Sequence, residues 1–68
     1  MRADLVLEDV VTRIEGPLLY AKREARVGLN AAVEVLGQDD ASRLGRVAAL
    51  DEPSMVIEVL QSTSGLAQ

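Results

Sequence analysis

Two pairs of neighbouring carboxylates, Asp39-Asp40 and Asp51-Glu52, are the residues of this sequence that could carry acid–base chemistry or hold a hard metal ion. A calcium loop needs acidic residues at alternate positions and more ligands, and general acid–base catalysis needs a companion base. Neither pair has these features, and both lie in stretches rich in turn-forming residues. Both pairs are therefore predicted to be solvated turn residues.

Histidine and cysteine are absent from the sequence. Their absence excludes Cys–His and Ser–His–Asp catalysis, disulfide bonds and thiolate metal sites. The phosphate-binding pattern G-x-x-x-x-G-K-[ST] is also missing, because the single lysine, Lys22, follows no glycine-rich loop. We therefore expect no catalytic residue, no metal ligand and no cofactor, and an independent small enzyme is the least favoured hypothesis.

Basic residues gather in one short stretch, at Lys22, Arg23 and Arg26, although the net charge of the protein is −4. That charge argues against electrostatically driven nucleic-acid binding, and a single aromatic residue, Tyr20, argues against a stacking platform for single strands. A charge run in a loop is usually solvated. Contact with an acidic partner is the alternative for these three residues.

A carboxylate interrupts the strongest strand signal in the sequence. Residues 55–60 are rich in β-branched side chains and are apolar on both sides of Glu58. A charge among apolar residues needs either water or an oppositely charged partner. Arg43 or Arg46, on a nearby stretch, is the predicted partner.

These side chains must be positioned by one small domain, because the chain has 68 residues. Apolar residues make up 49% of it and are almost all aliphatic, which suits a small β-domain. No apolar run reaches the length of a membrane span, and no signal-peptide core follows the start. A soluble, cytoplasmic domain without direct membrane insertion is therefore expected.

A sharp corner separates two predicted strands near the beginning of the chain. Residues 9–15 have the pattern of a half-buried strand, and residues 18–21 form a shorter one. Gly16 and Pro17 lie between them. They are expected to end the first strand, because glycine allows unusual dihedral angles and proline cannot donate to a strand ladder. Both residues are predicted to be structural, with a partner contact as the weaker alternative.

The middle of the chain supports two interpretations. Over residues 18–36 apolar positions recur every three or four residues, as in a helix, although a central glycine disfavours it. A charged loop followed by a strand at 32–36 is an equally good interpretation. Residues 43–50 also fit either a short helix or a strand. The polar stretches 38–42 and 51–54 are predicted turns.

Four short motifs stand in order along the chain. Residues 14–19 read I-E-G-P-L-L, and residues 56–66 read V-I-E-V-L-Q-S-T-S-G-L. They resemble the I-x-G-P-L and V-x-Q-V-F-E-x-T-S-G-[IL] patterns of the N-terminal β-barrel domain of rotary-ATPase B subunits. Residues 32–35 and 43–47 resemble the family's E-I-V-x-[IL] and R-x-G-x-V elements. The resemblance covers residues 9–66, and its G-P-L-L wording is closer to the non-catalytic B subunit than to the catalytic A subunit, whose turn reads G-P-x-V.

The sequence departs from the family pattern at a few positions. Leu60 stands for the family's aromatic residue, Glu58 for its glutamine and Ala31 for its glutamate, while residues 39–42 replace its D-G turn. Such changes are tolerable on a barrel. Related barrels occur in the α and β subunits of F-type enzymes and in flagellar or secretion ATPases.

The resemblance implies an all-β fold, a small closed antiparallel barrel of about six strands. It favours strands over helices at residues 31–37 and 43–50. It also implies one domain over residues 1–68, with an interdomain linker that begins within 61–68, so that Thr63 and Gly65 would lie at the joint.

The function implied by the resemblance is structural. In this family the barrels of alternating A and B subunits form a crown on the head of an ion-translocating ATPase or ATP synthase, peripheral to the membrane. Nucleotide binds in a following domain, and the peripheral stalk is a further expected partner. The competing hypothesis is a stand-alone or engineered small β-barrel that binds another protein without catalysis.

Overall fold

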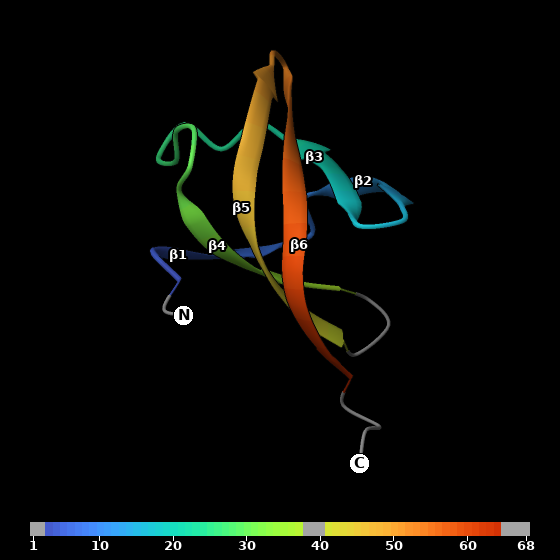
Figure 1. Ribbon diagram of the computed structural model, residues 1–68. Helices are drawn as coiled ribbons and strands as arrows, with labels where there is room; N and C mark the ends of the chain where they lie inside the picture. Colours follow the sequence, from blue (N-terminus) through green and yellow to red (C-terminus); the bar gives the residue numbers. More distant parts are fainter. Residues whose placement is uncertain (1–2, 38–40, 65–68) are drawn as a thin grey trace.

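Six β-strands and no helix make up the part of the protein that the computed structural model describes, residues 3–37 and 41–64 (Figure 1). This confirms the all-β prediction, and the two ambiguous stretches of the middle contain strands at 32–36 and 41–51 rather than helices. The strands in chain order are β1 (Leu5–Glu8), β2 (Val11–Glu15), β3 (Leu18–Lys22), β4 (Ala32–Leu36), β5 (Ala41–Asp51) and β6 (Ser54–Ser64).

The β5–β6 hairpin is the longest feature of the fold, with 11 residues in each strand. Its strands pair from Ala41 and Ser64 at one end to Asp51 and Ser54 at the other. The turn predicted at 51–54 is confirmed in its centre, because residues 52 and 53 connect the strands.

Two predicted connections are shorter than the sequence indicated. The predicted turn 38–42 loses residues 41 and 42 to β5, and the predicted linker 61–68 loses residues 61–64 to β6. The reason is that these polar ends pair with each other through their backbones, and ladder hydrogen bonds do not require apolar side chains. The other residues of both stretches lie outside the described part of the chain.

The sheet has the order β1-β4-β5-β6-β3-β2 and forms an open half-barrel that spans 193°. The prediction of a closed, wholly antiparallel barrel is therefore wrong in two respects. β1 pairs with β4 in parallel, and β1 and β2 are edge strands that do not pair with each other.

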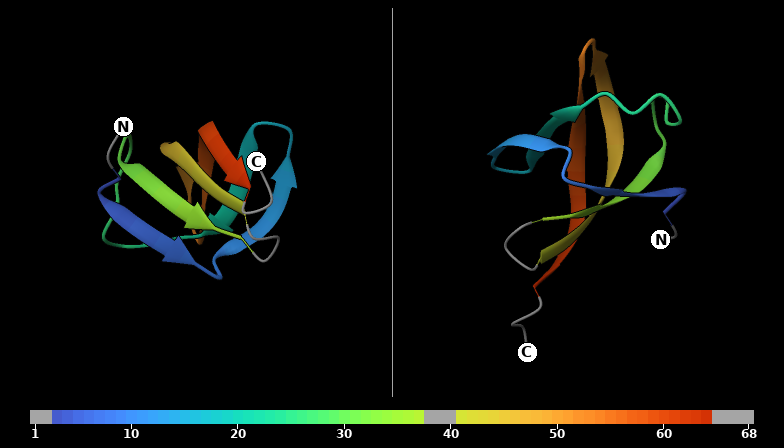
Figure 2. Two further views of the ribbon diagram at one scale, coloured as in Figure 1. Left: turned by 90° about the horizontal axis from the view of Figure 1, so that it is seen from below. Right: turned by 180° about the vertical axis from the view of Figure 1, so that it is seen from behind.

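β1 and β2 lie at opposite ends of the strand order, and the chain bends between them. Asp9 has a φ of 60°, so the chain leaves the edge of β4 and continues along β3 instead. The left view of Figure 2 shows this N-terminal segment passing from beside β4 to beside β3. The two edge strands are therefore consecutive in the chain. At the bend between them, the backbone N–H of Lys22 donates a hydrogen bond to the carbonyl oxygen of Val10.

The core lies on the concave side of the curved sheet and is entirely aliphatic apart from one methionine. The side chains of a strand point alternately to its two faces, so every second residue faces the core. Among the described residues, no polar or charged residue is buried. The buried hydrophobic residues are Leu7, Leu19, Ala21, Val27, Val33, Val35, Val47, Met55 and Ile57.

Candidate functional site

Gly16 and Pro17 occupy the two central positions of the β2–β3 turn. Gly16 has a φ of 56°, and the proline ring keeps φ negative at the second position, a combination that matches a type II′ hairpin turn. The carbonyl oxygen of Pro17 accepts a 2.7 Å hydrogen bond from the backbone of Val59. The corner is therefore tied to β6 as well as to its own hairpin.

The basic cluster predicted from the sequence is dispersed in the structure. Lys22 ends β3 with an exposed side chain, whereas the side chain of Arg23 is only 19% exposed. The guanidinium of Arg23 donates to the carbonyl oxygens of Glu24 and Val27, the latter at 2.6 Å, and to the carboxylate of Glu52 at 2.8 Å. The prediction of a solvated run is thus wrong for Arg23.

Arg23 therefore acts as a tie between two segments. Its backbone N–H donates to the carbonyl of Pro53, and its side chain holds the segment 23–27 against the β5–β6 turn. Val27, at the end of this segment, is buried against the core. Glu52, which was predicted to be a solvated turn residue, is the carboxylate that pairs with Arg23.

Arg26 points away from the fold and pairs with Glu24 at 3.0 Å. Hydrogen bonds from the side chain and the backbone N–H of Arg26 lower the pKa of Glu24 to about 2. The same carboxylate raises the pKa of Arg26. Because the pair is local and lies at the surface, its charges can also meet a partner.

Glu58 faces outward and accepts a 2.7 Å hydrogen bond from Arg46, which lies directly opposite on β5. Of the two partners predicted for Glu58, Arg46 is therefore confirmed. The other arm of the Arg46 guanidinium donates to the side-chain oxygen of Asn30 at 2.8 Å. Both charged side chains are 42% exposed, so the pair lies on an accessible face.

The outer face of the sheet continues this pair into a larger surface. Strand register places Leu18 of β3 beside Glu58, and Glu15 of β2 beside Leu18. One row of residues therefore crosses four strands, in the order Glu15, Leu18, Glu58 and Arg46. Leu18 separates the two carboxylates, and the ion pair lies at the β5 end. We call this row together with Arg13 and Tyr20 the outer-face surface.

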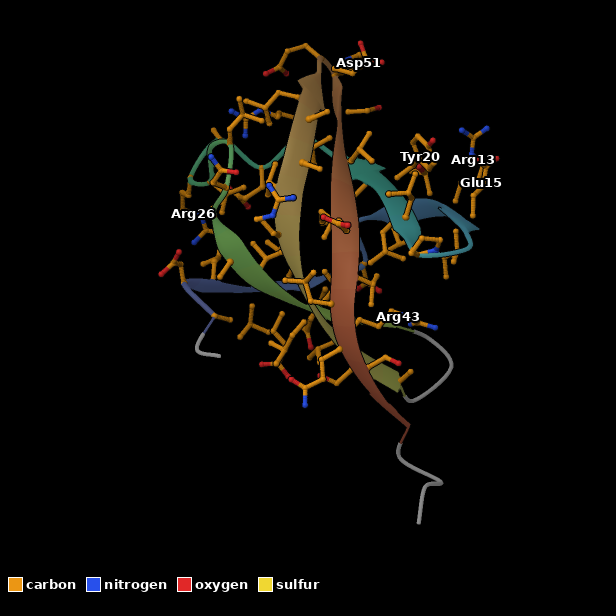
Figure 3. The ribbon with its side chains drawn as sticks, in the orientation of Figure 1. Arg13, Glu15, Tyr20, Arg26, Arg43 and Asp51 are labelled. Atoms are coloured by element: carbon orange, nitrogen blue, oxygen red, sulfur yellow. The ribbon has the colours of Figure 1, made fainter. Side chains whose placement is uncertain are left out.

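Arg13 and Tyr20 were missed as site candidates in the sequence. The guanidinium of Arg13 lies 4.2 Å from the centre of the Tyr20 ring and 3.2 Å from the carboxylate of Glu15 (Figure 3). The sequence could have predicted that Arg13 and Tyr20 are neighbours, because a two-residue turn at 16–17 places residue 13 opposite residue 20. These three side chains form the end of the outer-face surface at the edge of the sheet.

Little else in the described residues has the form of a chemical site. No three residues of the types His, Cys, Asp or Glu come close enough there to hold a metal ion. Residues 3–37 and 41–64 likewise contain no helix that could cross a membrane. Asp51 is exposed beside the turn, while Asp39, Asp40 and Gly65 lie outside the described residues, as does the side chain of Thr63.

Comparison with protein families finds a match over most of the chain. Residues 11–68 match the model of the β-barrel domain of the ATP synthase alpha/beta family. No solved structure shows a significant match to the chain.

Curated relatives agree with this match. The chain is 40% identical over 57 residues to a V-type ATP synthase beta chain of Halothermothrix orenii, covering 84% of this chain and 12% of the relative. It is 36% identical over 72 residues to a V-type ATP synthase beta chain of Anaeromyxobacter dehalogenans, covering 87% and 15%. The B subunit of an A-type ATP synthase of Halorubrum lacusprofundi is 33% identical over 58 residues, covering 85% and 12%. The chain therefore spans only about an eighth of the length of these relatives.

Proposed function

Because the chain belongs to the ATP synthase alpha/beta family as its β-barrel domain, we propose that it is a non-catalytic assembly domain of a V/A-type B subunit. In this role it joins the barrels of neighbouring A and B subunits into the crown of the head. The parent complex couples ATP hydrolysis or synthesis to ion transport, and the peripheral stalk is a further partner.

The observation that carries the proposal is the family match over residues 11–68, together with relatives that are all V-type beta chains or A-type B subunits. The relatives reach far beyond the matched region, and nucleotide binding belongs to that remainder in this proposal. A catalytic role for the barrel itself has no support in the sequence, since the chain contains neither histidine nor a G-x-x-x-x-G-K-[ST] motif.

The shape of the domain suits this role. A curved sheet with an aliphatic core deforms little, so it can hold a ring together while other domains open and close. The outer-face surface offers paired charges and the ring of Tyr20 for contacts with neighbours. Contacts of this mixed polar and aromatic kind are typical of protein interfaces.

The experiment is a domain exchange in the V-type ATP synthase beta chain of Halothermothrix orenii. The segment aligned with this chain is replaced by the 57 matching residues of this chain, and the hybrid is mixed with the catalytic subunit of the same complex. We expect native mass spectrometry to detect the assembled head, and ATP hydrolysis to be retained.

A beta chain that lacks the segment altogether is the control, and it should not assemble. Failure of the hybrid to assemble, while the isolated 68-residue chain is folded, would contradict the proposal. It would favour the stand-alone binding module instead. Hydrolysis of ATP by the isolated chain would contradict both.

A further inference from the structure

The free edge of β2 is a surface that the described fold leaves uncovered. β2 is the last strand in the sheet order and pairs only with β3 among the described strands. Its residues 12–15 are all exposed, and Ile14 is 50% exposed although it lies opposite the fully buried Leu19. An edge of this kind presents unpaired N–H and C=O groups to another strand.

The hairpin geometry shows which backbone groups face the free edge. In a two-residue hairpin the residues that close the turn bond to each other, so Glu15 and Arg13 direct their backbone groups towards β3. Ile14, between them, directs its N–H and C=O to the open side. A bulge between Val11 and Arg13 interrupts the ladder before this point, so regular pairing is confined to residues 13–15.

The charged side chains of β2 indicate which strand can pair with its free edge. Arg13 and Glu15 precede and follow Ile14 in the strand, and their side chains lie together on the outer face at the edge of the sheet (Figure 3). If a second copy pairs antiparallel with a two-fold axis at Ile14, each Arg13 lies opposite the partner's Glu15. An axis at Arg13 or at Glu15 would place like charges opposite each other, which is destabilising.

We propose that two copies of this chain pair through β2, antiparallel and centred on Ile14, to form a transient dimer. The two Ile14 side chains meet on the concave side, and two Arg13–Glu15 pairs form on the outer side. The interface is isologous, so the assembly closes at two copies. A contact of this size lies well below the roughly 1,200 Å² at which interfaces become stable, so dissociation is fast.

Sedimentation equilibrium from about 10 μM to about 1 mM tests the proposal, a range that covers weak association. We expect the wild-type chain to dimerise there. Arg13→Glu and Glu15→Arg each replace both attractive pairs by repulsive ones and should weaken dimerisation about ten- to a hundredfold. The second variant is the more telling, because it makes the chain less negative than its net charge of −4 and so reduces overall repulsion.

An equimolar mixture of the two single variants is the decisive measurement. In the mixed dimer the glutamate introduced at position 13 of one chain faces the arginine introduced at position 15 of the other. Complementarity is thereby restored at the wild-type total charge, and we expect the mixture to associate about as tightly as wild type. The internal Arg13–Glu15 bond is broken in both variants, so restored folding cannot explain the result.

Two controls carry the same charge changes elsewhere. Glu8→Arg lies on the opposite edge strand, β1, and Arg26→Glu lies in the exposed loop pair. Both should dimerise like wild type, and circular dichroism should show that every variant is folded. If a variant is unfolded, Ile14→Lys replaces it and should also abolish the dimer.

Three results would overturn the proposal. They are a wild-type chain that stays monomeric at about 1 mM, single variants that dimerise like wild type, or a mixture that fails to associate. Species larger than a dimer that disappear in Glu8→Arg would show head-to-tail pairing of β1 with β2 instead.

Discussion

The backbone carbonyl oxygen of Glu58 lies 2.5 Å from the position that a Cβ atom on Gly45 would occupy. The side chain of Ile57 is also close to that position, at 2.7 Å. β5 and β6 approach each other here at a register shift, between Leu44 and Gly45, where only a residue without a side chain fits. This gives a physical reason for the glycine in the stretch R-L-G-R-V.

Gly45→Ala is therefore expected to destabilise the domain. The added methyl group must displace backbone rather than a flexible side chain, so the loss should be about 2 kcal/mol or more of unfolding free energy. Urea titration followed by circular dichroism measures it. Gly28→Ala is the matched control, because nothing lies within 4 Å of its Cβ position. Equal stability of the two variants would contradict the close approach.

Arg23→Lys should loosen the loop that follows β3. A lysine cannot hold two carbonyl oxygens and a carboxylate in the fixed fork of a guanidinium, so we expect a loss of about 1–2 kcal/mol. Amide hydrogen exchange should quicken at Val27, whose N–H bonds to Glu24 within the loop. Lys22→Arg, at an exposed neighbour, is the control. Unchanged exchange in Arg23→Lys would show that the tie does not hold the loop.

The pair Arg46–Glu58 should contribute modestly, because both side chains are half-exposed. A double-mutant cycle with Arg46→Ala and Glu58→Ala is expected to give a coupling of about 0.5 kcal/mol. Arg46→Ala alone should cost more than Glu58→Ala, since it also releases Asn30. A coupling of zero would show that the pair does not contribute to stability, and the reverse order of the two single variants would show that Asn30 does not depend on Arg46.

Glu24 should make stability depend on pH in a defined window. Its pKa in the folded state is about 2, below the ordinary value of 4.5, mainly because the Arg26 side chain hydrogen-bonds to it. A lowered pKa stabilises the fold above the unfolded value, and that stabilisation is lost as pH falls from 4.5 towards 2. Glu24→Gln should therefore flatten the decline of the melting temperature in this window.

Arg26→Gln is the companion variant for this measurement, because it removes the largest cause of the shift. It should flatten the same part of the profile. If the melting temperature of Glu24→Gln falls in parallel with that of wild type, Glu24 is not the group responsible.

Local pattern was sufficient for several features of this protein. The Gly16-Pro17 corner, the two strands beside it and the strand around Glu58 follow from turn chemistry and from β-branched runs. The need of a carboxylate in an apolar strand led to Arg43 or Arg46 as the partner of Glu58, and the structure confirms Arg46. The family itself was recognisable from motifs spread over the chain.

Other features required contacts between segments far apart in sequence. β1 was not predicted, because its four residues acquire their role only by pairing in parallel with β4. The choice between helix and strand at β4 and β5 was even on local pattern, and the pairing of these strands decides it. The extension of β6 to Ser64 likewise depends on the partner strand.

Composition and local spacing thus determined the corner residues and the absence of histidine and cysteine, while the all-β class followed from the family resemblance. Tertiary structure alone decided that the sheet stays open, that Arg23 turns inward and that Arg13, Glu15 and Tyr20 meet at an edge. The physical reason is that periodicity and turn preference act over a few residues. Strand order, bulges and ion pairs depend instead on the free energy of packing distant segments together.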